Sequence, residues 1–174
     1  MSGHYVPMIA GDGQIEAVGS DGPTVRFAVG GDSAEIIRLA GSMYGSMGVD
    51  PSGQRWQRAA AGALAERLGR DVAVFVVDDP TEAGRLAAGG AASITTRLPG
   101  PLNPDGKVGY IQWISTDPRW RRHGMARAIT SALVAWLRDR GVGSIELHAT
   151  PDGEPLYRSL GFDHGPNPAL RVRV

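Results

Sequence analysis

The residues GYIQWISTDPRWRRHGMA, Gly109–Ala126, carry the pattern that decides the fold. Tyr110–Ser115 is rich in β-branched and aromatic side chains, which strands prefer. Pro118 disfavours helical geometry at the residue before it and so marks the end of this strand. From about Gly124 onward, apolar residues recur at steps of three and four, which predicts an amphipathic helix.

The short basic segment between this strand and this helix is a candidate anion site. The first N–H groups of a helix have no partner within the helix, and the helix dipole is positive at that end. Gly124 and Ala126 are small enough to let an anion approach the backbone, while Arg121 and Arg122 add positive charge. The segment therefore predicts a pyrophosphate cradle, and a solvated basic turn that only caps the helix is the alternative.

Two blocks of the sequence resemble the N-acetyltransferase superfamily known as GNAT. The run R-x-x-G-x-A at Arg121–Ala126 is similar to the coenzyme A signature of that superfamily. After a strand expected at Ser144–Thr150, the run PLYRSLGF at Pro155–Phe162 resembles its later L-Y-x-x-x-G-F helix. The blocks occur in the family's order and are bridged by one helix. The resemblance is firm over about Val72–Phe162, loose over Thr24–Arg70 and absent before that.

This resemblance implies an α/β fold with α+β layers. Its central sheet would be mixed, mostly antiparallel and flanked by helices, as in the GNAT-like acyl-CoA N-acyltransferases. The 174 residues suit one domain with its own core, expected over residues 24–174. Residues 1–23 are glycine-rich and weakly apolar, which predicts a flexible or partly ordered N-terminal extension.

Other elements are expected around the central strand and helix. A capping pattern at Asp32 and Glu35 predicts the start of one helix, and Ser52 is a candidate cap for the next. Gly89 and Gly90 indicate a bulge or a close backbone contact within their strand. The expected strands are Thr24–Val29, Val72–Val77, Leu86–Arg97 and Arg171–Val174, the second expected helix is Gln54–Leu68, Pro99–Lys107 is expected to be a loop, and Asp152 is expected to cap the helix at Pro155.

The family resemblance also implies how a coenzyme would be held. Acetyl-CoA would insert where the central strand splays from its neighbour, with strand backbone groups on the pantetheine arm and thioester oxygen and the basic loop on the pyrophosphate. The implied cofactor-binding residues are Ile114, Ser115, Thr116, Arg121, Arg122, His123, Gly124, Met125 and Ala126.

Tyr157 occupies the position where the family often places its general acid. A phenol with a pKa near 10 is protonated at neutral pH and can protonate a departing thiolate. The alternatives are that its hydroxyl only orients the sulfur, or that it packs and bonds locally. Relatives often carry an asparagine where Thr150 stands, which leaves the contacts of that amide unassigned here.

No residue is assigned as the general base. Glu146 and Asp117 are candidates by position, but each is also explained as a solvated charge or a cap. His148 can titrate near neutral pH, but a lone histidine on a strand is more often structural.

The acceptor side has the weakest signal. In the resembled fold the first two helices flank the acceptor groove, together with the loop at Pro99–Lys107 and the C-terminal segment. A small-molecule amine, an antibiotic, a polyamine, an amino acid and a protein N-terminus all stay open as acceptors, and the few acidic residues in these regions disfavour a polycation. Candidate lining residues, for which ordinary core packing is the alternative, are Met43, Tyr44, Met47, Arg55 and Trp56.

Composition excludes several other classes of protein. Lys plus Arg and Asp plus Glu both number 18, so no global field attracts nucleic acid or an anionic membrane. The chain has no cysteine, which excludes a disulfide framework and a thiolate metal site, and its four histidines lack ligand spacing, so no metal is expected. No apolar run approaches the roughly 20 residues that span a bilayer, and no secretory leader is apparent, so a cytoplasmic location is expected.

The sequence thus predicts an acetyl-CoA-dependent N-acetyltransferase that transfers the acetyl group directly to a primary amine, most simply of a small molecule. The alternative is a catalytically silent acyl-CoA-binding or regulatory module with the same fold. A nucleic-acid-binding protein is a third hypothesis, which the neutral net charge disfavours. Because members of the family often pair, a homodimer is one expected assembly.

Overall fold

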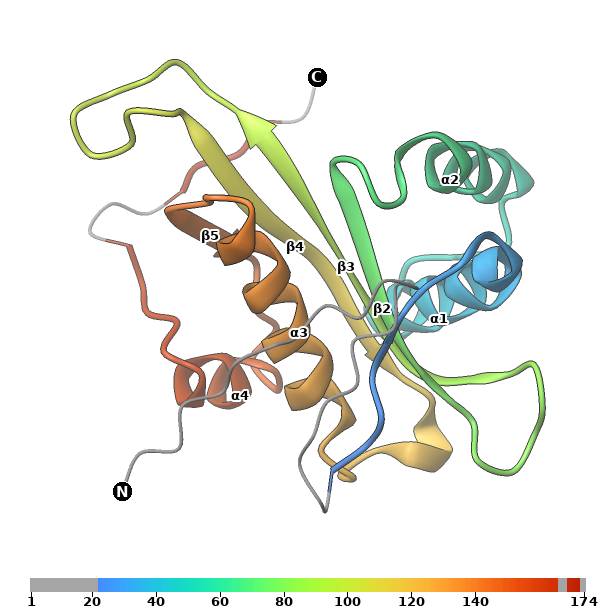
Figure 1. Cartoon of the computed structure of the whole chain (residues 1–174). Coiled ribbons are helices and arrows are strands. Elements are labelled where there is room, and N and C mark those ends of the chain that lie inside the picture. The colour runs from blue at the N-terminus through green and yellow to red at the C-terminus, as the bar shows by residue number, and fades with distance from the viewer. Residues whose placement is uncertain (1–21, 166–168, 173–174) are drawn as a thin grey trace.

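The computed structural model describes residues 22–165 and 169–172. A five-stranded sheet with the order β1-β2-β3-β4-β5 forms its centre (Figure 1). Every neighbouring pair is antiparallel except β4 and β5, which run parallel. The predicted mixed, mostly antiparallel sheet is therefore confirmed. The strands are β1 Arg26–Phe27, β2 Val72–Asp78, β3 Leu86–Thr96, β4 Lys107–Thr116 and β5 Ser144–Leu147.

Helices cover both faces of this sheet. In Figure 1, α3 crosses one face, and α1 and α2 lie on the other. The helices are α1 Ser33–Ser46, α2 Gln54–Arg67, α3 Met125–Asp139 and α4 Glu154–Ser159, with short 3-10 turns η1 Gly30–Asp32 and η2 Pro118–Trp120.

The two faces of the sheet have separate cores because β2 is apolar at successive positions. Phe75 packs toward α3, where Ile129 and Leu133 are fully buried. Val74 and Val76 pack on the opposite side with Leu39 of α1. A strand buried on both faces needs such a continuous apolar run, so this prediction from residues 72–77 is confirmed.

The central strand β4 is interrupted where it leaves β5. Ala91 of β3 pairs with Trp113 and Ala92 pairs with Ile111, so Gln112 is the extra residue of a β-bulge. The last pair between β4 and β5 joins Ile111 to Leu147. The remainder of β4 therefore runs on beyond the end of β5, and the sheet opens at this point.

Gly90 of β3 lies opposite this opening. Its surroundings decide between the two roles predicted for Gly89 and Gly90, which were a bulge or a close backbone contact. A Cβ at Gly90 would lie 2.7 Å from Cγ2 of Ile129 and would also meet Cδ1 of Ile114. Gly90 therefore permits a close approach of neighbouring side chains. The extra residues in the strand pairing are Gln112 of β4 and Ala87 of β3, not the two glycines.

Local capping differs from the predictions at three helices. Asp32 stands at the N-cap of α1, but its carboxylate accepts from the Val29 N–H at 2.8 Å and from Arg26 instead of capping the helix. Gly53 and Gly153 are the N-caps of α2 and α4, one residue after the predicted Ser52 and Asp152. The helix start predicted at Asp32 is therefore confirmed, although the Asp32 side chain does not cap the helix. The caps predicted at Ser52 and Asp152 were wrong, and the Ser52 hydroxyl donates to Asp50 instead.

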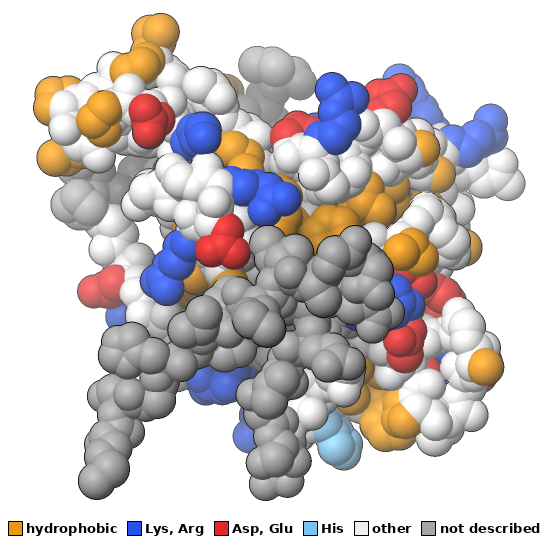
Figure 2. Space-filling view, viewed as in Figure 1, with side chains coloured by type: hydrophobic (Ala, Val, Ile, Leu, Met, Phe, Trp, Pro, Cys, Tyr) orange, Lys and Arg blue, Asp and Glu red, His pale blue; other side chains and the backbone are white. Residues whose placement is uncertain are grey.

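The ends of the chain are described only in part. The extension predicted at residues 1–23 lies outside the described residues except for its last two positions, and Arg173 and Val174 of the predicted last strand also lie outside. Arg171 and Val172 are described and are not in a strand. No helix within residues 22–165 and 169–172 is long and apolar enough to cross a membrane. Figure 2 shows acidic and basic side chains interspersed over one face.

Candidate active site

A groove of about 1810 Å³ lies where β4 separates from β5. Its walls come from the end of α1, the second half of β4, the loop before α3, the segment after β5 through α4, and residues 169–171. The opened sheet therefore exposes backbone of β4 along one side of a large groove, and the start of α3 lies at its edge.

The basic loop enters α3 through two residues with positive φ. Arg122 has φ 67° and is the only non-glycine residue of the described chain with positive φ. Gly124 is the N-cap of α3 with φ 78°, a conformation that suits glycine. These two left-handed residues turn the loop sharply onto the N-terminus of a 15-residue helix. Such turns, together with a helix N-terminus, form anion-binding concavities.

Most of the predicted cofactor residues line this groove. His123 does not line it: its Nδ1 donates to the Arg121 carbonyl at 2.8 Å, and its ring packs edge-on against Trp120. His123 therefore closes the loop on itself. The predicted residues that line the groove are Ile114, Ser115, Thr116, Arg121, Arg122, Gly124, Met125 and Ala126.

Tyr157 of α4 lines the same groove. Its ring packs edge-on against Phe162, with 6.0 Å between the centroids. Burial raises the pKa of the Tyr157 phenol, so the hydroxyl is protonated at neutral pH. A protonated phenol beside the opened strand can donate a proton.

The three candidate bases have different surroundings in the structure, and only His148 lines the groove. The Asp117 carboxylate is buried and caps η2 by accepting from the Arg119 N–H at 3.1 Å. Glu146 is held by Arg97 at 2.9 and 3.0 Å and does not line the groove. His148 lines the groove and stacks edge-on with Tyr110, with 5.9 Å between the ring centroids.

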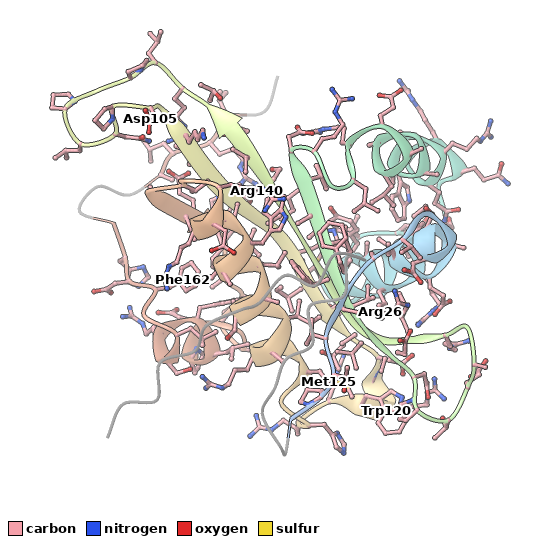
Figure 3. The ribbon with its side chains drawn as sticks, viewed as in Figure 1. Arg26, Asp105, Trp120, Met125, Arg140 and Phe162 are labelled. Atoms are coloured by element: carbon pink, nitrogen blue, oxygen red, sulfur yellow. The ribbon has the colours of Figure 1, made fainter. Side chains whose placement is uncertain are left out.

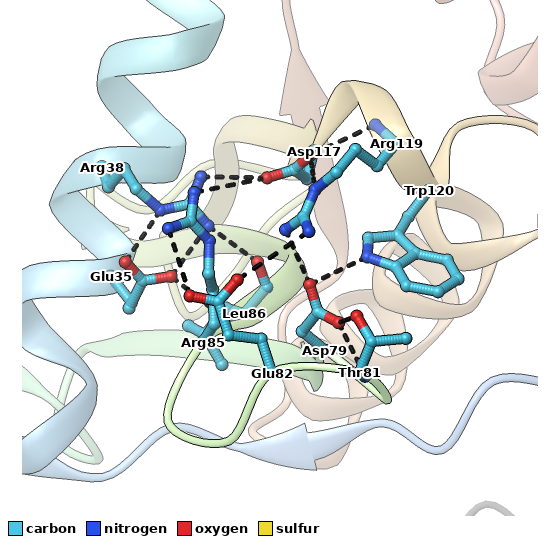
Figure 4. A network of polar contacts seen from close by, with 10 residues as sticks. All are labelled: Glu35, Arg38, Asp79, Thr81, Glu82, Arg85, Leu86, Asp117, Arg119 and Trp120. Atoms are coloured by element: carbon cyan, nitrogen blue, oxygen red, sulfur yellow. Dashed lines mark hydrogen bonds and ion pairs between the residues drawn. The ribbon is translucent and has the colours of Figure 1, made fainter.

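A polar network fixes the start of the basic loop (Figure 4). The Asp79 side chain is 0% exposed and accepts from Arg119 Nη2 at 2.8 Å and from Trp120 Nε1 at 3.0 Å. Hydrogen bonds from Thr81, from Trp120 and from the Thr81 backbone, with the charge of Arg119, hold the pKa of Asp79 far below its usual range despite burial. The side chains of Arg119 and Trp120 in η2 are thus both hydrogen-bonded to Asp79, the residue that follows β2.

Asp117 extends this network to α1. Its second oxygen accepts from Arg38 Nη1 at 3.2 Å, and Arg38 also donates to the Leu86 carbonyl and pairs with Glu35. Burial opposes ionisation of Asp117, but hydrogen bonds from the backbone and side chain of Arg119 and the charge of Arg38 outweigh it and lower the pKa. The network therefore joins the helix on one face of the sheet to the loop that leads into α3.

Sequence reasoning missed this network because its members are distant along the chain. Arg38 and Asp117 are separated by 79 residues, and Asp79 and Trp120 by 41 residues. Only the Asp117-Pro118 turn carried a local signal. No spacing pattern identifies the remaining partners.

Some residues proposed for the acceptor side reach the groove. Met43 and Tyr44 of α1 and Met47 at its C-cap line it, whereas Trp56 lines a separate pocket of about 560 Å³ between α1 and α2. Arg55 lines neither. No residue of the loop at 99–107 lines the groove, and Asp105 in this loop lies at the end of the molecule opposite Trp120 and Met125 (Figure 3).

The mixed sheet opens beside the basic loop and the start of α3, which is the arrangement expected of the resembled acyl-CoA N-acyltransferases. The family model described as "Acetyltransferase (GNAT) family" matches residues 42–162. The chain therefore belongs to the GNAT family of acetyltransferases, and the predicted acyltransferase is confirmed at the level of the family.

Similar proteins fall in the same family. A protein named mycothiol acetyltransferase from Nocardiopsis dassonvillei is 31% identical over 88% of this chain and 50% of its own length. The chain thus spans about half the length of that relative.

Solved structures share the fold. A predicted acetyltransferase with acetyl-CoA from Clostridium acetobutylicum is 23% identical with a TM-score of 0.73, covering 86% of this chain and 95% of that chain. A GCN5-related N-acetyltransferase from Ralstonia eutropha JMP134 is 24% identical with a TM-score of 0.72, covering 87% of this chain and 99% of that one.

Proposed function

We propose that this protein transfers the acetyl group of acetyl-CoA directly to a primary amine of a small molecule. The observation that carries the proposal is the groove itself, which brings the opened strand β4, the basic loop before α3 and Tyr157 together. The family supports acetyl transfer. The name of the Nocardiopsis relative refers to a small molecule, which supports a small acceptor here.

The coenzyme A diphosphate would bind at the start of α3. There the helix dipole and the N–H groups of Gly124, Met125 and Ala126 favour an anion. Arg121 and Arg122 are exposed at the groove edge and would add charge-assisted hydrogen bonds. The pantetheine arm would lie along Ile114, Ser115 and Thr116, because β4 pairs there with β3 on one side and has no β5 partner on the other.

Transfer then needs orientation and one proton donor. A neutral amine held against the thioester carbonyl attacks it, and the C–S bond breaks as the C–N bond forms. The Tyr157 phenol protonates the departing thiolate, and its burial keeps it protonated until then. No covalent intermediate with the protein is required.

Calorimetric titration with acetyl-CoA tests the cofactor assignment. Arg121→Glu combined with Arg122→Glu replaces attraction by repulsion at the diphosphate, and we expect at least ~100-fold weaker binding because charge-assisted hydrogen bonds contribute about 1.5–3 kcal/mol each. Arg55→Glu combined with Arg58→Glu is the matched control. It makes the same charge change on the exposed side of α2, outside the groove.

Thiol release in the presence of a panel of amines tests catalysis. Binding by the native protein, loss in the Arg121/Arg122 variant and retention in the control would support the proposal. A folded native protein that does not bind acetyl-CoA would refute it. Binding without thiol release for any primary amine would instead favour the silent acyl-CoA-binding module.

A further inference from the structure

One wall of the groove, on both sides of the bulge at Gln112, is aromatic and apolar. Tyr44 of α1 and Met47 at its C-cap are 38% and 55% exposed, although large side chains of this kind are usually covered. Tyr110 and Trp113 of β4 line the same groove. Trp113 packs with the core on the α1 side of the sheet, so this wall faces away from α3. Exposed aromatic and thioether surface in a groove favours an apolar, ring-bearing ligand.

The charges of the groove point to the same class of ligand. Four of its lining residues are arginines, namely Arg121, Arg122, Arg127 and Arg171, and Asp152 is its one carboxylate within the described chain. Arg121 and Arg122 would pair with the coenzyme diphosphate, so an acceptor would meet Arg127, Arg171 and a single carboxylate. This set of charges offers little attraction to a molecule with several positive charges. A single ammonium group can still be held against the faces of tyrosine and tryptophan rings.

His148 lies at the end of the β4–β5 pairing and lines the groove. It follows Leu147, whose partner on β4 is Ile111, and so lies next to the bulge at Gln112. Its ring contacts Tyr110 edge-on and lines the groove. Within residues 22–165 and 169–172, no hydrogen bond or ion pair occupies either ring nitrogen.

We propose that the acceptor is an aromatic primary monoamine and that His148 removes the proton from its ammonium group. This proposal rests on the acetyltransferase function proposed above. The ammonium gives one proton to a ring nitrogen of His148, and the neutral amine forms the C–N bond as the C–S bond breaks. Tyr157 protonates the sulfur, and the second proton lost by the nitrogen restores the phenol. One proton is released overall, from His148 to water.

An amine panel tests the acceptor class. The probes are phenethylamine, tryptamine, spermidine and glucosamine 6-phosphate, and the readout is thiol release from acetyl-CoA. We expect kcat/KM to be at least ~10-fold higher for the two aromatic amines. Tyr44→Ala and Met47→Ala should each raise KM for phenethylamine about 10-fold through lost apolar contact, with acetyl-CoA affinity unchanged. Leu102→Ala, fully exposed in the hairpin loop outside the groove, is the control.

A pH profile of His148→Gln tests the base. We expect kcat with phenethylamine to fall about 100-fold at pH 7 and to recover as pH rises, because more amine is then already neutral. The other titratable groups on this wall are Tyr110 of β4 and Tyr44 of α1, with Asp152 further along the same segment, and Glu146 is held by Arg97. His164→Gln changes an exposed histidine outside the groove and should leave kcat unchanged.

The outcomes separate this proposal from the one on which it rests. Equal or greater kcat/KM with spermidine or glucosamine 6-phosphate would overturn the acceptor class, while acetyl transfer itself would stand. A loss in His148→Gln that is the same at every pH, or smaller than threefold, would overturn the base. Failure of the folded native protein to bind acetyl-CoA would refute the acetyltransferase function as well.

Discussion

Tyr157 lines the groove, and its partly buried ring packs against Phe162, so the chemistry of its hydroxyl can be separated from the packing of its ring. Tyr157→Phe keeps the contact with Phe162 and removes only the proton donor. We expect kcat to fall about 100-fold, with acetyl-CoA affinity and melting temperature nearly unchanged, as measured by thiol release, calorimetry and thermal unfolding. A kcat within twofold of the native value would reduce Tyr157 to a packing role.

Asp117 allows a prediction about acid stability. Its pKa is lowered in the folded protein, so its stabilising effect is present above the unfolded-state pKa of about 3.9 and is lost as pH falls below that value. Asp117→Asn should cost about 1–3 kcal/mol at pH 7, because the arginines that surround it lose the negative charge and one of their two acceptor oxygens. The free energy of unfolding of the variant should also depend less on pH below about 4.

Urea unfolding at several pH values measures both effects of this substitution. Asp105→Asn is the control, since Asp105 is exposed in the hairpin loop and makes no ion pair within the described residues. An Asp117→Asn variant with the same stability and the same acid dependence as the native protein would show that the network adds nothing to the fold.

Strand β3 depends on the absence of a side chain at Gly90, because Ile114 and Ile129 occupy the space that a Cβ would need. Gly90→Ala should therefore destabilise the protein by about 1–3 kcal/mol through overpacking. Gly62→Ala is the matched change in α2, where nothing lies within 4 Å of the added carbon. It should stabilise by about 0.5–1 kcal/mol. Denaturant midpoints measure both, and a neutral Gly90→Ala would show that β3 and α3 can separate at no cost.

Among the helices and strands, those that follow from a pattern within one segment could be predicted from the sequence. The continuous apolar run at 72–77 and the apolar residues spaced three and four apart after Gly124 are each a pattern within one segment of the sequence. These two segments form β2 and α3. The bulge at Gln112 was not predictable, because it depends on how β3 and β4 pair. Asp32 is the N-cap that the sequence predicts, but the partners of its carboxylate were not predictable, since Arg26 and the Val29 N–H bind it instead of the helix.

In the whole molecule, too, the features that depend on contacts between distant segments could not be predicted from the sequence. The two family blocks at Arg121–Ala126 and Pro155–Phe162 contain most of the predicted coenzyme site, and both contribute to one groove. The acceptor wall has no such motif, because it is assembled from α1, β4 and the end of β5. Tyr110 and His148 are therefore ordinary strand residues in the sequence, and only their contact across β4 and β5 distinguishes them.

Because acetyl-CoA would contact strand β4, the start of α3 and α4 at once, its binding should stabilise the entire fold. Ligand at 100 times its Kd adds about 2.7 kcal/mol when it binds only the folded state. For a chain of 174 residues this corresponds to a rise in melting temperature of about 5–11 °C. The Arg121→Glu plus Arg122→Glu variant should lose most of this rise at the same ligand concentration, whereas the Arg55→Glu plus Arg58→Glu control should keep it. Equal rises in the variant and the control would place the bound coenzyme away from the basic loop.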